Sequence, residues 1–432
     1  MQLKVNNRLI SFFLIFISIF SFFLGFYFNE NSAGAGSYNG DILTVWKNLQ
    51  IFLSNDLISS IEHKEYITSR TPIVYLFHEI FNPLTHDIES FRLSVLIFSL
   101  LIPILFFYCL KQKFVKEDNL LLLLISSTIL LSPYFRTSAY WGLEENFGIA
   151  FLLLSFLFLN NFLNCEEKKK NKIHIDLIAL TFFSSCSLYF DQKLIFIPLI
   201  CLFKVLSSDK LFKFKFLSIF YYFLFSLPYF YLIMLWGGLI PSALLEGRKL
   251  GNEVFLEHIG YLSTIIAFYL LPLLLFKGKY LASLLEDFFK NKQNYYLIFL
   301  FGIYLFYMIG FYDFENQLSA GKGFIHKISL ILFSENIFRM IFVYFSFFAS
   351  WIIILIYFEN KLYDILILFY LFILSIFLWP MFQEYFDPLI LLLVFTFFTS
   401  KVYINYKNSI ILFVYLSVFL SGANVYYLNL LN

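Results

Sequence analysis

The sequence predicts an all-α, polytopic membrane protein, and three observations lead to that class. Of the 432 residues, 60% are hydrophobic and only 14% are charged, whereas soluble domains carry about 25% charged residues. The mean hydropathy is +0.78. Apolar runs of about 20 residues, the length that a helix needs to cross the hydrocarbon core of a bilayer, recur along the whole chain. We therefore expect a helical bundle without a separate soluble domain, with membrane lipids and no nucleic acid among its partners.

The apolar runs predict about thirteen membrane-spanning helices. The first is interpreted as a retained anchor, because its apolar core of about 20 residues exceeds that of a secretory signal peptide. The expected spans are residues 9–28, 91–110, 119–134, 146–164, 175–189, 194–206, 216–236, 259–276, 295–311, 340–358, 362–379, 388–399 and 409–428.

Lysines gather in alternate connections between these spans, notably Lys168–Lys170 and the pair Lys277 and Lys279. Because cytoplasmic loops carry the excess of Lys and Arg, the N-terminus is predicted to lie inside and the connection 29–90 outside. A composition rich in Phe, Ile, Lys, Asn and Tyr is typical of an AT-rich bacterial genome. The predicted location is the cytoplasmic (inner) membrane of a bacterium.

The first outer loop, residues 29–90, is about sixty residues long and lies between two predicted spans. Apolar residues at helical spacing predict an amphipathic helix over 42–54, and Thr71-Pro72 is a typical start for a second one. Both helices are expected to lie in the plane of the membrane interface. The two apolar stripes are Ile42, Val45, Trp46, Leu49, Phe52 and Leu53, and Ile73, Leu76, Phe77, Ile80 and Phe81.

Asp41 opens the first of these helices and has two interpretations. It is either an N-cap, for which Asp is among the best residues, or a carboxylate held just above the membrane. In the second case it could accept a proton from an attacking hydroxyl or amine, or hold a divalent cation.

The second outer loop, residues 132–146, contains the adjacent acids Glu144 and Glu145 at the start of a membrane helix. They either stabilise the positive end of the helix dipole or supply a second carboxylate that faces Asp41. Tyr140 and Trp141 are interpreted as aromatic residues of the membrane interface.

The order of these features resembles the GT-C superfamily of glycosyltransferases, the group of protein mannosyltransferases and aminoarabinose transferases. The resemblance covers residues 1–206, with a variable transmembrane module in 207–432. It implies transfer of a sugar from a polyprenyl-phosphate-linked donor with inversion, in which Asp41 and then Glu144 or Glu145 take the catalytic positions. Asn39-Gly40 precede Asp41 where the family has paired acids. We therefore assign no metal ligand, and a divalent cation, Mg²⁺ or Mn²⁺, stays an alternative.

Such a donor needs cations at the outer face, since Arg binds phosphate as a fork and Lys as a point charge. Each of these cations is otherwise an ordinary solvated charge. A late stretch with Glu384 and Tyr385 resembles a motif found near the C-terminus of many GT-C proteins. The candidates for binding phosphate are Arg70, Arg136, Lys193, Arg248, Lys249, Lys322 and Lys327, with His326 beside the last two.

Two other functions stay open. A transporter or lipid-linked glycan flippase would place ionisable groups inside its spans, whereas these spans are almost free of charge. A surface-polysaccharide polymerase would share the lipid-linked substrate. The sequence therefore favours a glycosyltransferase whose acceptor is a glycan, a lipid or a protein. The four cysteines and six histidines show neither a disulfide framework nor metal-ligand spacing.

Overall fold

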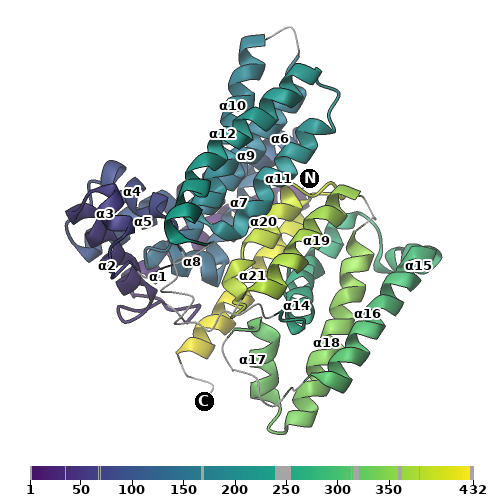
Figure 1. Ribbon diagram of the computed structural model, residues 1–432. Helices are drawn as coiled ribbons and strands as arrows, with labels where there is room; N and C mark the ends of the chain where they lie inside the picture. The colour runs from purple at the N-terminus through teal and green to yellow at the C-terminus, as the bar shows by residue number, and fades with distance from the viewer. Residues whose placement is uncertain are drawn as a thin grey trace. The chain divides into compact units, whose positions relative to one another are not determined.

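A computed structural model describes residues 2–34, 36–66, 68, 70–166, 170–238, 254–312, 314, 321–358, 362–378 and 380–428. Throughout these residues the regular structure is α-helix with four short 3-10 helices, and no strand occurs among them (Figure 1). The predicted all-α class is confirmed.

The chain divides into two compact units. The N-terminal unit holds Ile15–Gly251 with Leu420–Leu428, and the C-terminal unit holds Met1–Leu14, Asn252–Phe419 and Asn429–Asn432. The sequence places a boundary after residue 206. The packing places it later, because α12 (Phe212–Trp236) packs against α10 (Lys170–Phe190) and α11 (Phe196–Leu206).

The helices before that boundary are α1 (Gln2–Tyr27), α2 (Asp41–Ser54), α3 (Leu57–Ile61), α4 (Pro72–Phe81), α5 (Ile88–Ser99), α6 (Leu101–Lys113), α7 (Asn119–Ser127), η1 (Thr128–Leu131), α8 (Pro133–Tyr140), α9 (Glu145–Asn164), α10, η2 (Gln192–Ile195), α11 and α12. Those after it are α14 (Glu257–Leu273), η3 (Leu274–Lys277), α15 (Leu281–Lys290), α16 (Lys292–Phe311), α17 (Gly323–Leu332), α18 (Asn336–Tyr357), α19 (Leu362–Phe377), η4 (Gln383–Tyr385), α20 (Leu389–Phe395) and α21 (Tyr406–Tyr427).

Within the described residues, nine helices are long and apolar enough to cross a membrane, or up to ten if a bent pair counts as one span. The prediction of about thirteen spans is not confirmed. Three of the predicted spans, 194–206, 362–379 and 388–399, form helices of 11, 16 and 7 residues. At a rise of about 1.5 Å per residue the last one covers only about 10 Å of a hydrocarbon core about 30 Å thick.

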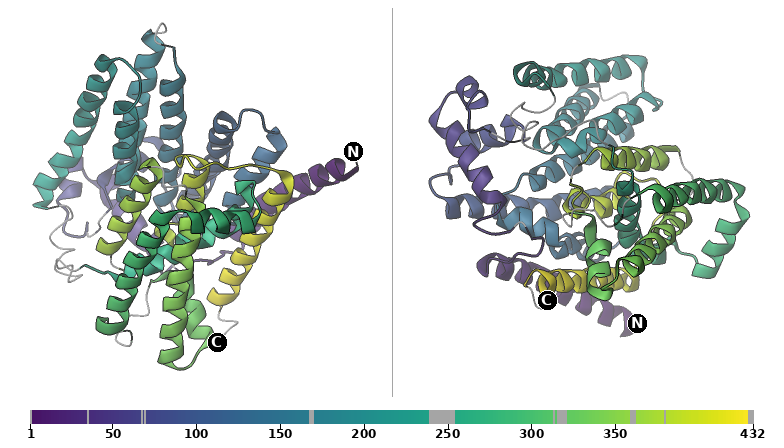
Figure 2. Two further views of the ribbon diagram at one scale, coloured as in Figure 1. Left: turned by 90° about the vertical axis from the view of Figure 1, so that its right-hand side faces the viewer. Right: turned by 60° about the horizontal axis from the view of Figure 1, so that its bottom comes forward.

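In the N-terminal unit, α9 and α10 form the most extensive helix pair, flanked by α6 and α12. Figure 1 shows α9, α10 and α12 side by side. In the C-terminal unit, α14 is the central helix, with 78% of its most apolar stretch buried. It packs against α17, α18, α19 and α20, while α16 lies along α18 in all views (Figure 2). These arrangements fix the helix ends on which the polar groups sit.

The first loop contains both predicted amphipathic helices, α2 and α4, and the short α3 between them. The stripe predicted for α2 does not face lipid: Ile42, Leu49 and Phe52 are buried in protein, because α2 packs against α4. On α4, by contrast, the predicted lipid-facing residues Ile80 and Phe81 are 66% and 69% exposed. Only the C-terminal end of α4 therefore presents apolar side chains outward, because Ile73, Leu76 and Phe77 of the predicted stripe are partly buried against the core.

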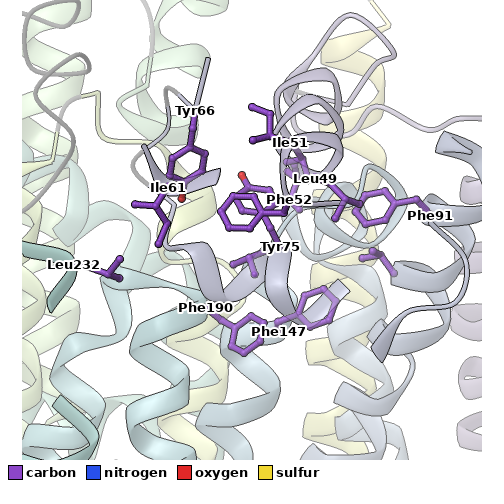
Figure 3. Packing of buried hydrophobic residues seen from close by; sticks show 14 of the residues in the cluster. Leu49, Ile51, Phe52, Ile61, Tyr66, Tyr75, Phe91, Phe147, Phe190 and Leu232 are labelled. Atoms are coloured by element: carbon purple, nitrogen blue, oxygen red, sulfur yellow. The ribbon is translucent and has the colours of Figure 1, made fainter. Parts of the chain in front are cut away.

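A hydrophobic core joins the first loop to the helix ends beneath it. In Figure 3 the rings of Phe52 and Tyr75 lie together above Phe147 of α9 and Phe190 of α10. The Phe147 and Phe190 rings are stacked with centroids 5.6 Å apart. Burying side chains of this size contributes about 1.5–3 kcal/mol each. The loop is thus fixed to the bundle by apolar contacts before any ionic contact is counted.

The second outer loop differs from the prediction. Residues Pro133–Tyr140 form α8, bent by 69° from the segment Asn119–Leu131, because Ser132 caps the helix and Pro133 takes its first position. Tyr140 and Trp141 are buried rather than interfacial. Tyr140 donates to the carbonyl of Phe22 at 2.6 Å, and the Trp141 indole donates to the carbonyl of Glu30 at 3.0 Å.

Candidate functional site

Four of the predicted site residues meet in one ionic cluster of the N-terminal unit. Arg70 of the first loop donates from Nε to Oε1 of Glu144. Lys193 of η2 lies 3.8 Å from Glu145 Oε1 and 3.5 Å from Asp191 Oδ2. The cluster, defined as Arg70, Glu144, Glu145, Asp191 and Lys193, is nearly enclosed, since its side chains are only 11–17% exposed.

Hydrogen bonds to the backbone of Arg70 hold this residue in place within the first loop. Tyr66 donates its hydroxyl to the Arg70 carbonyl at 2.8 Å, and the Arg70 amide donates to Thr68 Oγ1 at 3.1 Å. The next residue, Thr71, donates its hydroxyl to the carbonyl of Tyr189 at the end of α10. Thr71 therefore begins α4 as predicted, but its side chain fastens the loop to α10 instead of capping the helix.

The three acids lie at helix ends, two at the start of α9 and one directly after α10. Glu144 and Glu145 stand at the N-terminus of α9, where the helix dipole favours negative charge. Asp191 follows the last residue of α10 and accepts from the Lys193 amide at 3.1 Å, which starts η2. Gly148 lets these two ends meet, because a Cβ there would lie 2.7 Å from the Asp191 Cβ.

The cluster holds three carboxyls and two cations in surroundings where charge is poorly solvated. Burial raises the pKa of Glu144 to about 7, with Glu145 adding to the rise and Arg70 opposing it. Burial likewise raises the pKa of Asp191, against the effect of Lys193. Burial alone would lower the pKa of Arg70, but Glu144, together with Tyr75 and Glu145, outweighs burial and keeps the guanidinium charged. The cluster therefore approaches electrical neutrality when Glu144 carries a proton.

Among the described residues, one carboxylate oxygen of the cluster lacks a hydrogen-bond partner. Oε2 of Glu144 is buried and accepts no hydrogen bond from any described residue, although its companion Oε1 is bonded to Arg70. Leaving a buried polar atom unsatisfied costs about 1–3 kcal/mol. Such an atom is a candidate acceptor for a hydroxyl group of a ligand. On the loop side, Tyr75 accepts from Asn48 at 3.3 Å and burial raises its pKa to about 12, so it stays neutral.

Asp41 is not a member of this ionic cluster. It is the first residue of α2, half-buried, and Gly40 occupies the N-cap position without a side-chain cap. The N-cap interpretation of Asp41 is therefore wrong, because its own backbone is already helical. Across the described part of the chain no hydrogen bond or ion pair joins Asp41 to Glu144 or Glu145.

Arg136 is committed to helix packing. Its guanidinium donates to Glu30 Oε2 at 2.7 Å, to Ser21 Oγ at 2.6 Å and, through Nε, to the carbonyl of Leu130 at 2.7 Å. The side chain is 2% exposed. These bonds fasten α1 to η1 and α8, and leave little of the guanidinium for a phosphate.

The remaining described candidates belong to the C-terminal unit. His326 and Lys327 lie on α17, and Glu384 and Tyr385 lie in η4. Burial lowers the pKa of Lys327 to about 8 although the Glu384 carboxylate opposes the shift. Burial, with Lys322 nearby, lowers the pKa of His326 to about 4.

Arg248 and Lys249 lie outside the described residues. In the part of the chain that the structure describes, no three His, Cys, Asp or Glu side chains converge to hold a metal ion, and we assign no metal ligands. On sequence grounds Asp191-Gln192-Lys193 is either a tight polar turn, which is favoured, or part of the site wall. In the structure Asp191 begins the turn at η2 and its carboxylate also pairs with Lys193 in the cluster.

Comparison of the chain with protein-family models, with curated proteins and with solved structures found no match. The site must therefore be interpreted from its own chemistry.

Proposed function

We propose that this protein is a membrane glycosyltransferase that moves a sugar from a polyprenyl-phosphate-linked donor to an acceptor at the outer face of the cytoplasmic membrane. The observation that carries the proposal is the ionic cluster. Arg70, Glu144, Glu145 and Lys193 come from three separate segments, and all four were candidate site residues on sequence grounds. Helix packing alone does not need five charged side chains in one nearly enclosed place.

The reaction is an inverting displacement. The acceptor oxygen or nitrogen attacks the anomeric carbon, and a carboxylate takes the proton that the acceptor loses. The bond between the anomeric carbon and the phosphate oxygen breaks, and its electron pair leaves on the phosphate. A cation then stabilises the charge that develops on that oxygen.

Residue roles follow from accessibility and charge. Asp41 is half-buried at the head of α2 and is proposed as the general base at the acceptor. Glu144 is proposed to position the acceptor or sugar through its unpartnered Oε2. Lys193 and Arg70 are proposed to face the phosphate. They are held by Glu145 and Glu144, so their geometry is set before a donor binds.

The donor's lipid chain needs a route from the bilayer. The exposed side chains Ile80 and Phe81 of α4 form an apolar edge next to the loop that carries Arg70. We propose that the polyprenyl chain lies along this edge, which amphipathic helices commonly present to a membrane interface.

The test is transfer of radiolabelled sugar from polyprenyl-phosphate donors in membranes that contain the wild type, Asp41→Asn, Glu144→Gln or Glu65→Gln. Glu65 is the matched control, because it lies in the same loop and forms an exposed ion pair with Lys47. We expect transfer by the wild type and by Glu65→Gln, and a loss of at least about 100-fold in Asp41→Asn at equal protein level. Wild-type-like transfer by Asp41→Asn would remove it as the base. Absence of transfer with every donor, together with uptake or flipping of a lipid-linked glycan, would favour the transporter alternative instead.

A further inference from the structure

The C-terminal unit contains a cavity of about 240 Å³ that is separate from every predicted site residue. It lies between α15, the beginning of α16 and the end of α18. Its polar lining includes Lys277, Lys279, Asp287 and Asn294, and its apolar lining consists of Leu284, Phe288, Leu355, Ile356 and Phe358.

The polar lining offers positive charge and one vacant acceptor. Lys277 is 5% exposed and its Nζ lies 4.8 Å from the centre of the Tyr357 ring. Lys279 is 55% exposed and pairs with Asp287 at 2.7 Å. Asn294 is 4% exposed and donates to the Phe288 carbonyl at 2.9 Å, while its Oδ1 accepts no hydrogen bond from any described residue. A ligand that complements Lys277, Lys279 and Asn294 carries negative charge and a hydroxyl donor.

The surroundings resemble the headgroup region of a bilayer. The cavity opens at the ends of two candidate spans, Lys292–Phe311 and Asn336–Tyr357. Beside it lies α15, a short helix flanked by Tyr280 at 86% exposure and carrying Phe289 at 58% exposure. Exposed aromatic residues at span ends typically sit at the membrane interface.

We propose that this cavity binds the headgroup of an anionic phospholipid with a hydroxyl-bearing headgroup, of the phosphatidylglycerol type. The phosphate lies against Lys277 and Lys279, and a headgroup hydroxyl donates to Asn294 Oδ1. The first part of an acyl chain packs on Leu355 and Phe358. Basic cavities between membrane helices bind anionic headgroups in this way. The proposal does not depend on the glycosyltransferase function.

Asp287 is the acidic residue of the cavity lining, and it should oppose binding of an anionic headgroup. Its carboxylate neutralises part of the charge of Lys279 and repels a phosphate. Removing this charge in Asp287→Asn should increase retention of the anionic lipid, whereas Lys279→Gln should decrease it. Both side chains are about half exposed, so neither change disturbs the core. A merely structural ion pair would make the two variants behave alike.

The experiment uses the purified full-length protein in nanodiscs of phosphatidylcholine with a small fraction of phosphatidylglycerol, with retained lipids counted by native mass spectrometry. The matched control is Lys292→Gln, which removes a lysine from the start of α16, the helix that carries Asn294, but not from the cavity lining. One lysine near a membrane contributes about 1 kcal/mol, so we expect about a fivefold loss for Lys279→Gln, a gain for Asp287→Asn and less than a twofold change for Lys292→Gln.

Three outcomes would overturn the proposal. The first is equal retention of phosphatidylglycerol and phosphatidylcholine by the wild type. The second is an equal loss in Lys279→Gln and Lys292→Gln, which would indicate a general surface charge effect. The third is displacement of the lipid by millimolar inorganic phosphate with tight binding of that ion in lipid-free detergent, which would indicate a site for free phosphate.

Discussion

Arg70 and Glu144, 74 residues apart in sequence, form an ion pair that joins the first loop to the start of α9. Both side chains are nearly enclosed. A pair of this kind is costly to break, because removal of one partner leaves the other as an uncompensated buried charge.

We expect Arg70→Gln to lower the free energy of unfolding by about 3 kcal/mol at pH 8. The loss should be smaller at pH 5, where Glu144 can take up a proton. Glu144→Gln should be milder than Arg70→Gln at pH 8, because Glu145 still compensates the guanidinium charge. Thermal unfolding of Arg70→Gln and Glu144→Gln in detergent, at pH 8 and pH 5, measures these losses of stability. Lys47→Gln, which breaks an exposed pair with Glu65, should change stability by no more than about 0.5 kcal/mol. Additive effects in the double variant would contradict a direct pairing.

The raised pKa of Glu144 makes stability depend on pH. On folding, the pKa of Glu144 rises from 4.5 to about 7, so the folded state binds this proton more tightly than the unfolded state. The protonated carboxyl therefore contributes to stability at low pH. That contribution is lost as the pH rises from about 4.5 through 7, by on the order of 1–3 kcal/mol. The unfolding midpoint of the wild type should therefore fall over this range more than that of Glu144→Gln. Parallel curves for the two proteins would show that Glu144 does not carry the effect.

Gly148 offers a steric test of the cluster. In Gly148→Ala the new Cβ would meet Asp191 Cβ at 2.7 Å and Leu194 Cδ1 at 3.0 Å, so α9 and η2 must separate. Overpacking of this kind costs about 1–3 kcal/mol, and displacement of Asp191 and Lys193 should reduce sugar transfer. Gly302→Ala in α16 is the matched control, because nothing lies within 4 Å of its Cβ position. It should be neutral or stabilise by up to about 1 kcal/mol. Equal stability and activity of the two variants would argue against tight packing at Gly148.

Arg136 tests whether a predicted phosphate ligand is instead a packing residue. Arg136→Met leaves the nearly enclosed Glu30 carboxylate without its cation, and should lower the free energy of unfolding by about 3 kcal/mol. The KM for the donor should not rise in the folded fraction. Arg136→Met/Glu30→Met should recover part of the stability, since both charges are then absent. A normal melting curve with a raised donor KM would instead support the phosphate role.

Periodicity in the sequence was enough to predict the long helices and the two amphipathic helices of the first loop. The spans predicted at 194–206, 362–379 and 388–399 stay unconfirmed, because an apolar run of intermediate length is equally typical of a buried core helix. Burial in protein, not contact with lipid, explains the all-apolar sequence of α20, in which every residue from Leu389 to Phe395 is buried.

For the candidate site, too, the sequence predicts one part and the tertiary structure decides the rest. The sequence alone determined the class of the protein and which charged residues stand at helix ends, because composition and spacing act locally along the chain. Only the tertiary structure decided that Arg70, Glu144, Glu145 and Lys193 meet, and that Asp191 lies among them. It also decided that the guanidinium of Arg136 is hydrogen-bonded to Glu30 and Ser21. Those outcomes depend on how the first loop docks on α9 and α10, and such contacts between distant segments leave no periodic signal in the sequence.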